Sequence, residues 1–188
     1  LESYFNNPNN PGTISNNYIR SITKDSQGDL WIGTNHGLNK YDKSKKTFVK
    51  FFNEPDNINS LSVNNITKLY TDRSGILWIG TSFGINEYIP SENKFKRYVH
   101  SDSIKESLSE NTILSVYEDR SGNMWFGTYA GLNKLNRISG NFIHYSHNPG
   151  SLNSLSNNYV YSFSEDETGN FWVGTGGGLN KFNPSSGT

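Results

Sequence analysis

The stretch DRSGILWIGTSFGINEY, residues 72–88, decides the fold, because three close variants of it occur elsewhere in the chain. The variants are DSQGDLWIGTNHGLNKY (25–41), DRSGNMWFGTYAGLNKL (119–135) and DETGNFWVGTGGGLNKF (166–182). Each copy holds one of the four tryptophans, which lie 47 residues apart, and the 188 residues make four such periods. A fixed period of this length is typical of solenoids, propellers and arrays. We therefore expect one repeat domain that spans residues 1–188.

Each repeat contains four segments with the pattern of a short β-strand. In the first repeat these are 18–25, which alternates apolar and polar residues, 30–34, which is a short apolar run, and then 37–41 and 48–52. The link DSQG fits a tight hairpin turn, in which Asp accepts backbone hydrogen bonds and Gly takes a positive φ at the fourth position. Four strands in about 47 residues predict an all-β fold, a β-propeller built from four four-stranded blades.

The motif LWIGT, residues 30–34, predicts how neighbouring blades pack. Strand geometry points Trp31 and Gly33 to one face of the blade, and Leu30 and Ile32 to the other, so both faces should be buried. A Trp beside a Gly in every repeat predicts that the indole of one blade lies over the backbone of the next, where a Cβ would obstruct it. Burial of these rings, at about 25 cal/mol per Å², should dominate the stability of each blade interface.

Composition excludes several classes of partner. The 17 basic and 17 acidic residues balance, so the broad positive field that nucleic acid or an anionic membrane requires is missing. The chain has no cysteine, which excludes disulfides and thiolate chemistry. We find neither a signal peptide nor an apolar run long enough to span a bilayer. Because the chain begins at Leu1 rather than Met, we expect an excised or processed piece.

The two ends of the sequence suggest how a ring closes. After residue 182 the sequence runs NPSSGT, so the last repeat has three strand patterns, while LESYFNNP (1–8) aligns with FIHYSHNP (142–149). In this alignment Tyr4 corresponds to Tyr145, Tyr98 and Phe51. We expect the N-terminal strand to complete the last blade and remove open sheet edges. The same geometry permits a swap, in which two chains form one eight-bladed ring, and we expect a homodimer.

Binding residues are expected where strand direction brings two sets of loops to one side of a propeller, around its central channel. One candidate group recurs before the innermost strands, as Asn17, Asn64, Asn111 and Asn158. These asparagines either cap their own loops or form a ring of amide groups suited to sugar hydroxyls.

A second candidate group lies where the repeat varies, between the Thr and the Gly of the core motif. The variable pairs are Asn35-His36, Ser82-Phe83, Tyr129-Ala130 and Gly176-Gly177, and Tyr18 and Tyr159 could add to the same wall. These residues are either freely drifting loop positions or the aromatic and polar lining of a small-molecule site. The predicted ligand-binding set is Asn17, Tyr18, His36, Asn64, Phe83, Asn111, Tyr129, Asn158 and Tyr159.

The sequence gives little support to a catalytic or a metal-binding site, and we expect no catalytic residue, no metal and no cofactor. The four histidines, His36, His100, His144 and His147, share no single repeat position, although His100 and His147 correspond. His144 and His147 should point to opposite faces, which is poor metal geometry. The aspartates that recur with the turn glycine are expected to serve the turn rather than acid–base chemistry.

The repeated pattern D-x-x-G-x-x-W-[IFV]-G-T-x-x-G-[LI]-N resembles the two-component regulator propeller repeat over essentially the whole chain. That family builds the extracytoplasmic, periplasmic sensor region of hybrid histidine kinases, usually with more than four blades in a ring. The resemblance implies a non-enzymatic propeller that senses a ligand, often a glycan or its breakdown product, and is coupled to a kinase elsewhere in the full protein.

Two other functions stay open at this point. Streptogramin-type lyases are propellers whose repeats also resemble D-x-x-G-x-x-W, and they work with a metal ion and a histidine on the channel face. Only His36 is suitably placed for that role, and no acidic partner recurs beside it. The third alternative is a structural repeat fragment that only folds and oligomerises. The sequence identifies neither the ligand nor the ring size.

Overall fold

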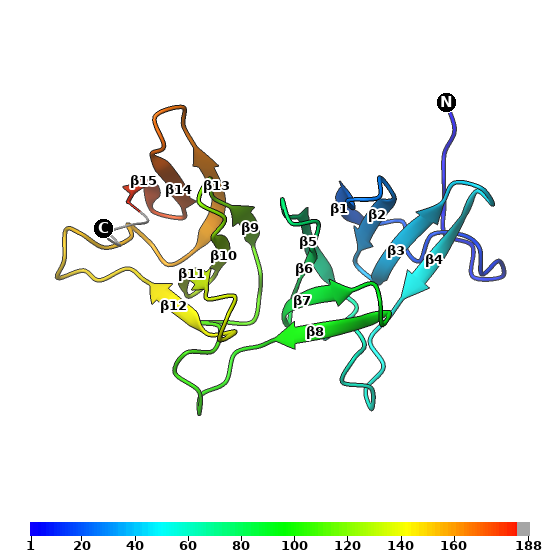
Figure 1. Cartoon of the computed structure of the whole chain (residues 1–188), viewed down its shortest axis with the longest axis horizontal. Coiled ribbons are helices and arrows are strands. Elements are labelled where there is room, and N and C mark those ends of the chain that lie inside the picture. Colours follow the sequence, from blue (N-terminus) through cyan, green and yellow to red (C-terminus); the bar gives the residue numbers. More distant parts are fainter. Residues whose placement is uncertain (184–188) are drawn as a thin grey trace. The chain divides into compact units, whose positions relative to one another are not determined.

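The computed structural model describes residues 1–183, which form 15 β-strands and, within that range, no helix (Figure 1). No helix long and apolar enough to cross a membrane therefore occurs in the described part of the chain. The strands make four antiparallel sheets, each formed by strands that are consecutive in the sequence. This confirms the all-β class and the division into one blade per repeat.

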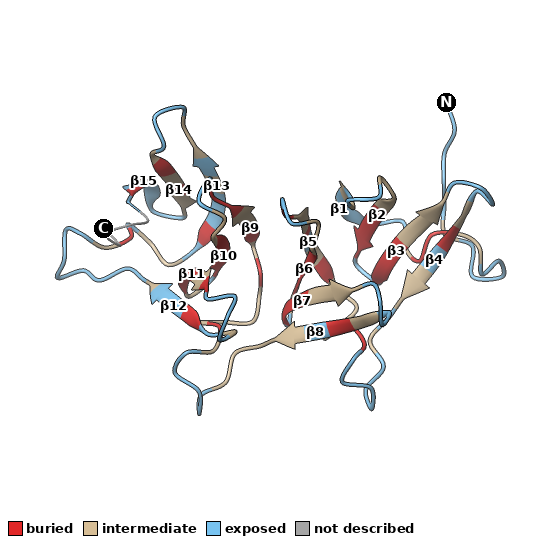
Figure 2. Ribbon diagram, viewed as in Figure 1, coloured by how far each residue is buried: buried red, intermediate tan, exposed pale blue. Residues whose placement is uncertain are grey.

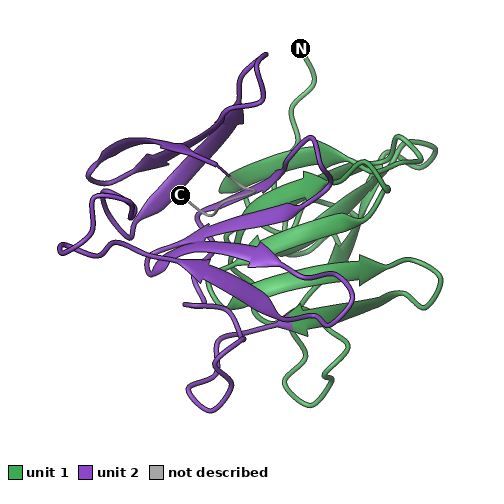
Figure 3. Ribbon diagram, turned by 60° about the vertical axis from the view of Figure 1, so that its left-hand side comes forward, with its two compact units in different colours: residues 1–97 green, residues 98–188 purple. Residues whose placement is uncertain are grey.

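The chain divides into two compact units, residues 1–97 and 98–188 (Figure 3). Unit 1 holds the first two blades. Blade 1 consists of β1 (Ile19–Lys24), β2 (Leu30–Thr34), β3 (Gly37–Asp42) and β4 (Thr47–Phe51), and blade 2 of β5 (Ile66–Thr71), β6 (Leu77–Thr81), β7 (Gly84–Ile89) and β8 (Lys94–Tyr98).

Unit 2 holds the other two blades. Blade 3 consists of β9 (Ser115–Glu118), β10 (Met124–Thr128), β11 (Gly131–Leu135) and β12 (Phe142–Tyr145), and blade 4 of β13 (Val160–Glu165), β14 (Phe171–Thr175) and β15 (Gly178–Phe182). Three blades are thus four-stranded, and the described part of blade 4 is three-stranded. That the four blades form a single domain stays a prediction.

The strand and turn predictions are confirmed to within one residue in the first repeat, where β2 has the predicted bounds. In the DSQG turn, the Gly28 N–H donates to the Asp25 carbonyl at 3.0 Å, and Gly28 has φ +79°. A carboxylate oxygen of Asp25 also accepts the backbone N–H groups of Gln27 and Asp29. The turn therefore forms because Asp supplies acceptors and Gly tolerates the left-handed conformation.

The core of each unit lies where one blade packs on the next, and the middle strands carry most of the buried residues (Figure 2). In unit 1 Trp31 of blade 1 is fully buried among blade 2 residues that include Ile66, Leu69 and Leu77. In unit 2 Trp125 of blade 3 is equally buried against Phe171 and other residues of blade 4. The predicted role of the tryptophans at blade interfaces is confirmed at these two positions.

We predicted that the motif glycine makes room for an indole of the neighbouring blade, and this prediction is wrong. A Cβ on Gly33 would lie 2.5 Å from Cγ2 of Ile66, on the innermost strand of the next blade, rather than against an indole. At Gly127 a Cβ would meet the hydroxyl of Ser115 in the same blade, and also the carbonyl oxygen and Cγ1 of Val160, again on the next innermost strand. The glycine is thus required by the close approach of the neighbouring inner strand, which brings a β-branched side chain against the bare backbone.

Two polar networks repeat in every blade. The indole N–H of each tryptophan donates to the aspartate six residues earlier, at 2.7–2.8 Å, in the pairs Trp31–Asp25, Trp78–Asp72, Trp125–Asp119 and Trp172–Asp166. The asparagine that ends each core motif binds the incoming loop: Asn39 accepts the N–H of Ser15 and donates to its hydroxyl, both at 2.8 Å. The recurring polar residues of the motif therefore hold turns and loops in place, since their buried hydrogen-bonding groups are paired within the blade.

The predicted closure by the N-terminal strand stays a prediction. Residues 1–7 form no strand, and the described residues provide no fourth strand on the outer edge of β15. The prediction also involves the final segment NPSSGT, of which residues 184–188 lie outside the described part of the chain.

Candidate functional site

Within a blade, the loop that enters the innermost strand meets the turn between the second and third strands. The Asn35 N–H donates to the Tyr18 carbonyl at 3.1 Å, and the Gly176 N–H donates to the Tyr159 carbonyl at 2.9 Å. Blade 2 has the same bond, from Ser82 to Asn65. The two predicted groups of candidate residues thus lie at one edge of these blades, as strand direction required.

The recurring asparagines have an architectural role in the structure. The side-chain oxygens of Asn17 and Asn64 each accept, at 2.6 Å, the backbone N–H of the residue eleven positions earlier. Asn111 and Asn158 do the same for His100 and His147, at 2.8 and 2.7 Å. These bonds close the long loops between blades, and each uses one of the two lone pairs of the amide oxygen.

Two predicted residues from different blades come together in unit 2. The rings of Tyr129 (blade 3) and Tyr159 (blade 4) meet edge to face, with centroids 5.2 Å apart and planes at 80°. Both remain close to half exposed, at 44% and 48%. Next to them the exposed Gly176 and Gly177 present bare backbone, and Gly176 lies so close that a Cβ on it would be 3.2 Å from Oδ1 of Asn157 and 3.4 Å from the Cβ of Tyr159. The result is an exposed aromatic pair beside a backbone surface without side chains.

In unit 1 the corresponding positions hold a different set of rings. Tyr18 is 65% exposed, and Phe83 is 50% exposed at the turn of blade 2. His36 contacts Phe52 with ring centroids 5.5 Å apart. The sequence analysis did not single out Phe52 as a site residue, although an aromatic directly after the outer strand was a usable signal, because β4 ends beside the β2–β3 turn.

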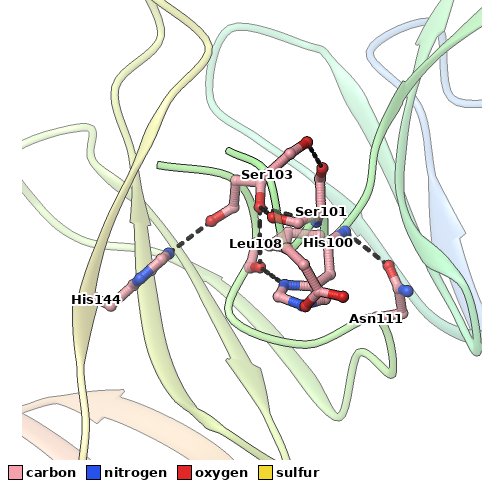
Figure 4. Close-up of polar contacts among 8 residues, drawn as sticks. His100, Ser101, Ser103, Leu108, Asn111 and His144 are labelled. Atoms are coloured by element: carbon pink, nitrogen blue, oxygen red, sulfur yellow. Dashed lines mark hydrogen bonds and ion pairs between the residues drawn. The ribbon is translucent and has the colours of Figure 1, made fainter. Parts of the chain in front are cut away.

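The other histidines serve the loops. His100 Nδ1 lies 2.6 Å from the Leu108 carbonyl, and His147 Nδ1 lies 2.6 Å from the Leu155 carbonyl. At the equivalent position of the loop before blade 2, Asn53 Nδ2 donates to the Leu61 carbonyl. Figure 4 shows His100 between Leu108 and Asn111, and His144 to the left with its ring pointing toward the loop that holds His100. His144 contacts the Ser107 carbonyl through Nε2. These hydrogen bonds tie His100, His144 and His147 to the loops between blades.

Charged groups near the motif have shifted pKa values. Burial by itself would raise the pKa of Asp25, but the indole N–H of Trp31 and two backbone N–H groups lower it overall. The pKa of Asp166 is lowered, chiefly by hydrogen bonds from the hydroxyl of Thr168 and the indole of Trp172. The carbonyl of Leu108, and then the carboxylate of Asp102, raise the pKa of His100. The aspartates are therefore held as anions by the turn and the indole, which is unsuited to a general acid.

No group of three or more His, Asp or Glu side chains in the described residues is arranged to hold a metal ion. His36, the residue placed best for lyase-like chemistry, has a phenylalanine ring as its described neighbour.

A family model described as "Two component regulator propeller" matches residues 13–36, 60–83, 107–130 and 154–177. The chain belongs to the two component regulator propeller family. Each matched segment runs from the incoming loop to the turn between the second and third strands of a blade, so it covers the Asp–Trp pair and the variable turn, whereas the asparagine that ends the core motif lies three residues beyond it.

Solved structures support the propeller fold. The extracellular domain of BT3049 from B. thetaiotaomicron, described as a hybrid two component system, has 25% sequence identity and a TM-score of 0.72 over 93% of this chain and 30% of its own. The extracellular domain of BT4673 from the same organism has 26% identity and a TM-score of 0.74 over 88% of this chain and 21% of its own. The chain therefore spans less than a third of the length of these two relatives.

A streptogramin B lyase structure is more distant, with 16% identity and a TM-score of 0.62 over 98% of this chain and 59% of its own. At this identity the likeness shows the fold alone. No curated protein matches the chain.

Proposed function

We propose that this chain is part of a ligand-sensing, non-enzymatic propeller located outside the cytoplasm. The family match and the two extracellular domains at 25% and 26% identity support this assignment. The polar residues that recur in the repeat are used for turns, indole pairs and loop closure, which leaves the variable turn residues as the positions free to differ between ligands.

The observation that carries the proposal is the Tyr129–Tyr159 pair. Two exposed rings held edge to face present both an apolar surface and hydroxyl groups, which is the combination that binds the C–H face and the hydroxyls of a sugar. The neighbouring Gly176 and Gly177 are exposed and carry no side chain that would cover the two rings. We assign a glycan or a similar small polar ligand to this site.

Titration of a panel of soluble oligosaccharides by isothermal calorimetry tests the proposal on the chain itself. For a saccharide that binds, Tyr129→Ala and Tyr159→Ala should each weaken the affinity about tenfold, which corresponds to about 1.4 kcal/mol for a lost aromatic contact. Ile138→Ala is the matched control, because Ile138 is fully exposed in the turn between β11 and β12.

Two results oppose the proposal. Binding that is unchanged in both tyrosine variants would remove the site from this pair of rings. A panel in which no saccharide binds the wild-type chain would remove the assigned ligand class.

A further inference from the structure

A cavity lies along the outer edge of β15 in unit 2. Its volume is about 390 Å³, and its lining includes Tyr145, Leu155, Asn180, Lys181 and Phe182. In blade 1 the equivalent edge, that of β3, is covered by β4, with Leu38 opposite Phe51 and Lys40 opposite Val49. The cavity therefore occupies the place of a fourth strand.

Blade 4 leaves the leucine of its third strand exposed, whereas blades 1 and 3 bury theirs. Leu179 is 68% exposed, whereas the equivalent Leu38 in unit 1 and Leu132 in unit 2 are fully buried. Among the described residues no strand pairs with the outer side of β15, and a sheet edge of this kind beside an exposed leucine favours the addition of a strand.

A further chain segment has the side-chain pattern of that strand. In residues 1–5, LESYF, the apolar Leu1 and Tyr4 take the repeat positions of Phe142 and Tyr145 in β12. In β12 these two residues face the core and the two between them are exposed. Leu1–Phe5 is largely exposed and forms no strand in the single chain.

In the single chain this segment already lies against blade 1, at the place where the outer strand of a preceding blade would lie. Tyr4 lies against Tyr41 and Phe48 of blade 1, with ring centroids 5.5 Å apart in both pairs. Phe51 of β4 lies in the same way against Tyr88 and Phe95 of blade 2, at 5.9 and 5.7 Å. Tyr4 thus contacts blade 1 as an outer strand of a preceding blade would, and its hydroxyl meets that of Tyr41 at 2.8 Å.

We propose that residues Leu1–Phe5 of a second copy of this chain add to β15 as the fourth strand of blade 4, and that blade 1 of that copy packs on the Trp172 face. A second copy is the occupant because every copy carries both halves of the contact, the exposed Leu179 edge in unit 2 and the segment Leu1–Phe5 held against blade 1 in unit 1. By the register of β3 and β4, Tyr4 of the second copy lies opposite Leu179, and its Glu2 lies opposite Lys181. The opposite charges of Glu2 and Lys181 favour this register.

Disulfide cross-linking tests the proposal cleanly, because the chain has no cysteine of its own. A variant with Glu2→Cys is mixed with a variant with Lys181→Cys under mild oxidation. We expect a covalent heterodimer, seen on a non-reducing gel and by intact mass. A matched control replaces Lys181→Cys by Lys134→Cys, the same position in β11, which is already paired with Ile143 of β12. This control mixture should give little heterodimer.

The double variant, with Glu2→Cys and Lys181→Cys in one chain, separates the second copy from closure within the chain. A covalent dimer supports the proposal, and a quantitative internal disulfide in a monomer overturns it. Light scattering on the wild-type chain supplies the reading without cysteines, with a dimer expected and a strict monomer at all concentrations against the proposal. Deletion of residues 1–5 should abolish the dimer.

Discussion

The blade interface in unit 1 and the open side of blade 4 are built from the same motif but have different surroundings. Trp31 is fully buried and contacts Phe51 and Tyr88, with ring centroids 5.4 and 5.0 Å apart. Trp172 keeps its aspartate and its lysine, since Lys181 lies 5.8 Å from the ring centroid, yet it remains partly exposed. The motif therefore builds each blade by itself, whereas the next blade supplies most of the burial of the tryptophan.

Replacement of Trp31 and of Trp172 should lower the free energy of unfolding by very different amounts. We expect Trp31→Ala to lower the free energy of unfolding by about 3–5 kcal/mol, because a large buried ring is removed from a packed interface. Trp172→Ala should cost about 1–2 kcal/mol, since part of its ring already faces solvent. Urea unfolding is followed by circular dichroism in a background that lacks residues 1–5, so that dimer formation does not bury Trp172. Equal losses in the two variants would contradict the comparison.

A smaller difference is expected at the motif glycines. In Gly33→Ala the new Cβ meets Ile66 Cγ2 at 2.5 Å and Ile66 Cβ at 3.1 Å, and Ile66 is fully buried. This overpacking should cost about 1–3 kcal/mol. In Gly174→Ala the obstructing group is the hydroxyl of Ser162, which can rotate away, and the next atom is 3.7 Å distant.

We therefore expect Gly174→Ala to cost less than about 1 kcal/mol, well below the cost at Gly33. Unfolding midpoints in urea, compared for both variants in the same background, measure the difference. If Gly174→Ala is as harmful as Gly33→Ala, the requirement for glycine arises within the blade rather than from the next inner strand.

The period of 47 residues was enough to predict the strands and turns, because those features depend on residues close together in one repeat. The register between neighbouring blades was not predictable in this way. Repetition shows that Trp31 and Gly33 share a face, but not that Ile66 rather than an indole approaches the glycine. The glycine prediction was wrong for this reason.

The candidate site was predicted in part. Strand direction placed Tyr129 and Tyr159 at the same edge, but their direct contact depends on the distance between two blades, which the sequence does not contain. The asparagine that ends each core motif was missed, although its occurrence 24 residues after a serine in every repeat was a usable signal for the pair Asn39–Ser15 and its equivalents. Its function depends on a loop that returns to the blade from the previous repeat.

A weaker effect is expected from acid pH on the free energy of unfolding. The folded state lowers the pKa of Asp25 and Asp166, so each carboxylate stabilises the fold above its unfolded pKa of about 3.9, and this contribution is lost as the pH falls through the lower folded value. The wild-type chain should therefore lose stability from about pH 4 downward. Asp25→Asn and Asp166→Asn should each be less stable at pH 7 and show a shallower decline.

Urea midpoints at pH 7 and pH 3 measure both quantities for the wild type and the two variants. The decrease at pH 7 should be larger for Asp25→Asn, because Asp25 also lies 3.6 Å from Lys40 and accepts the indole N–H of a fully buried tryptophan. Variants that keep the full wild-type decline would show that other carboxylates carry the acid sensitivity. A larger loss at Asp166 than at Asp25 would mean that burial of the indole does not strengthen its bond to the turn, and the contrast between the covered and the open blade would then rest on apolar packing alone.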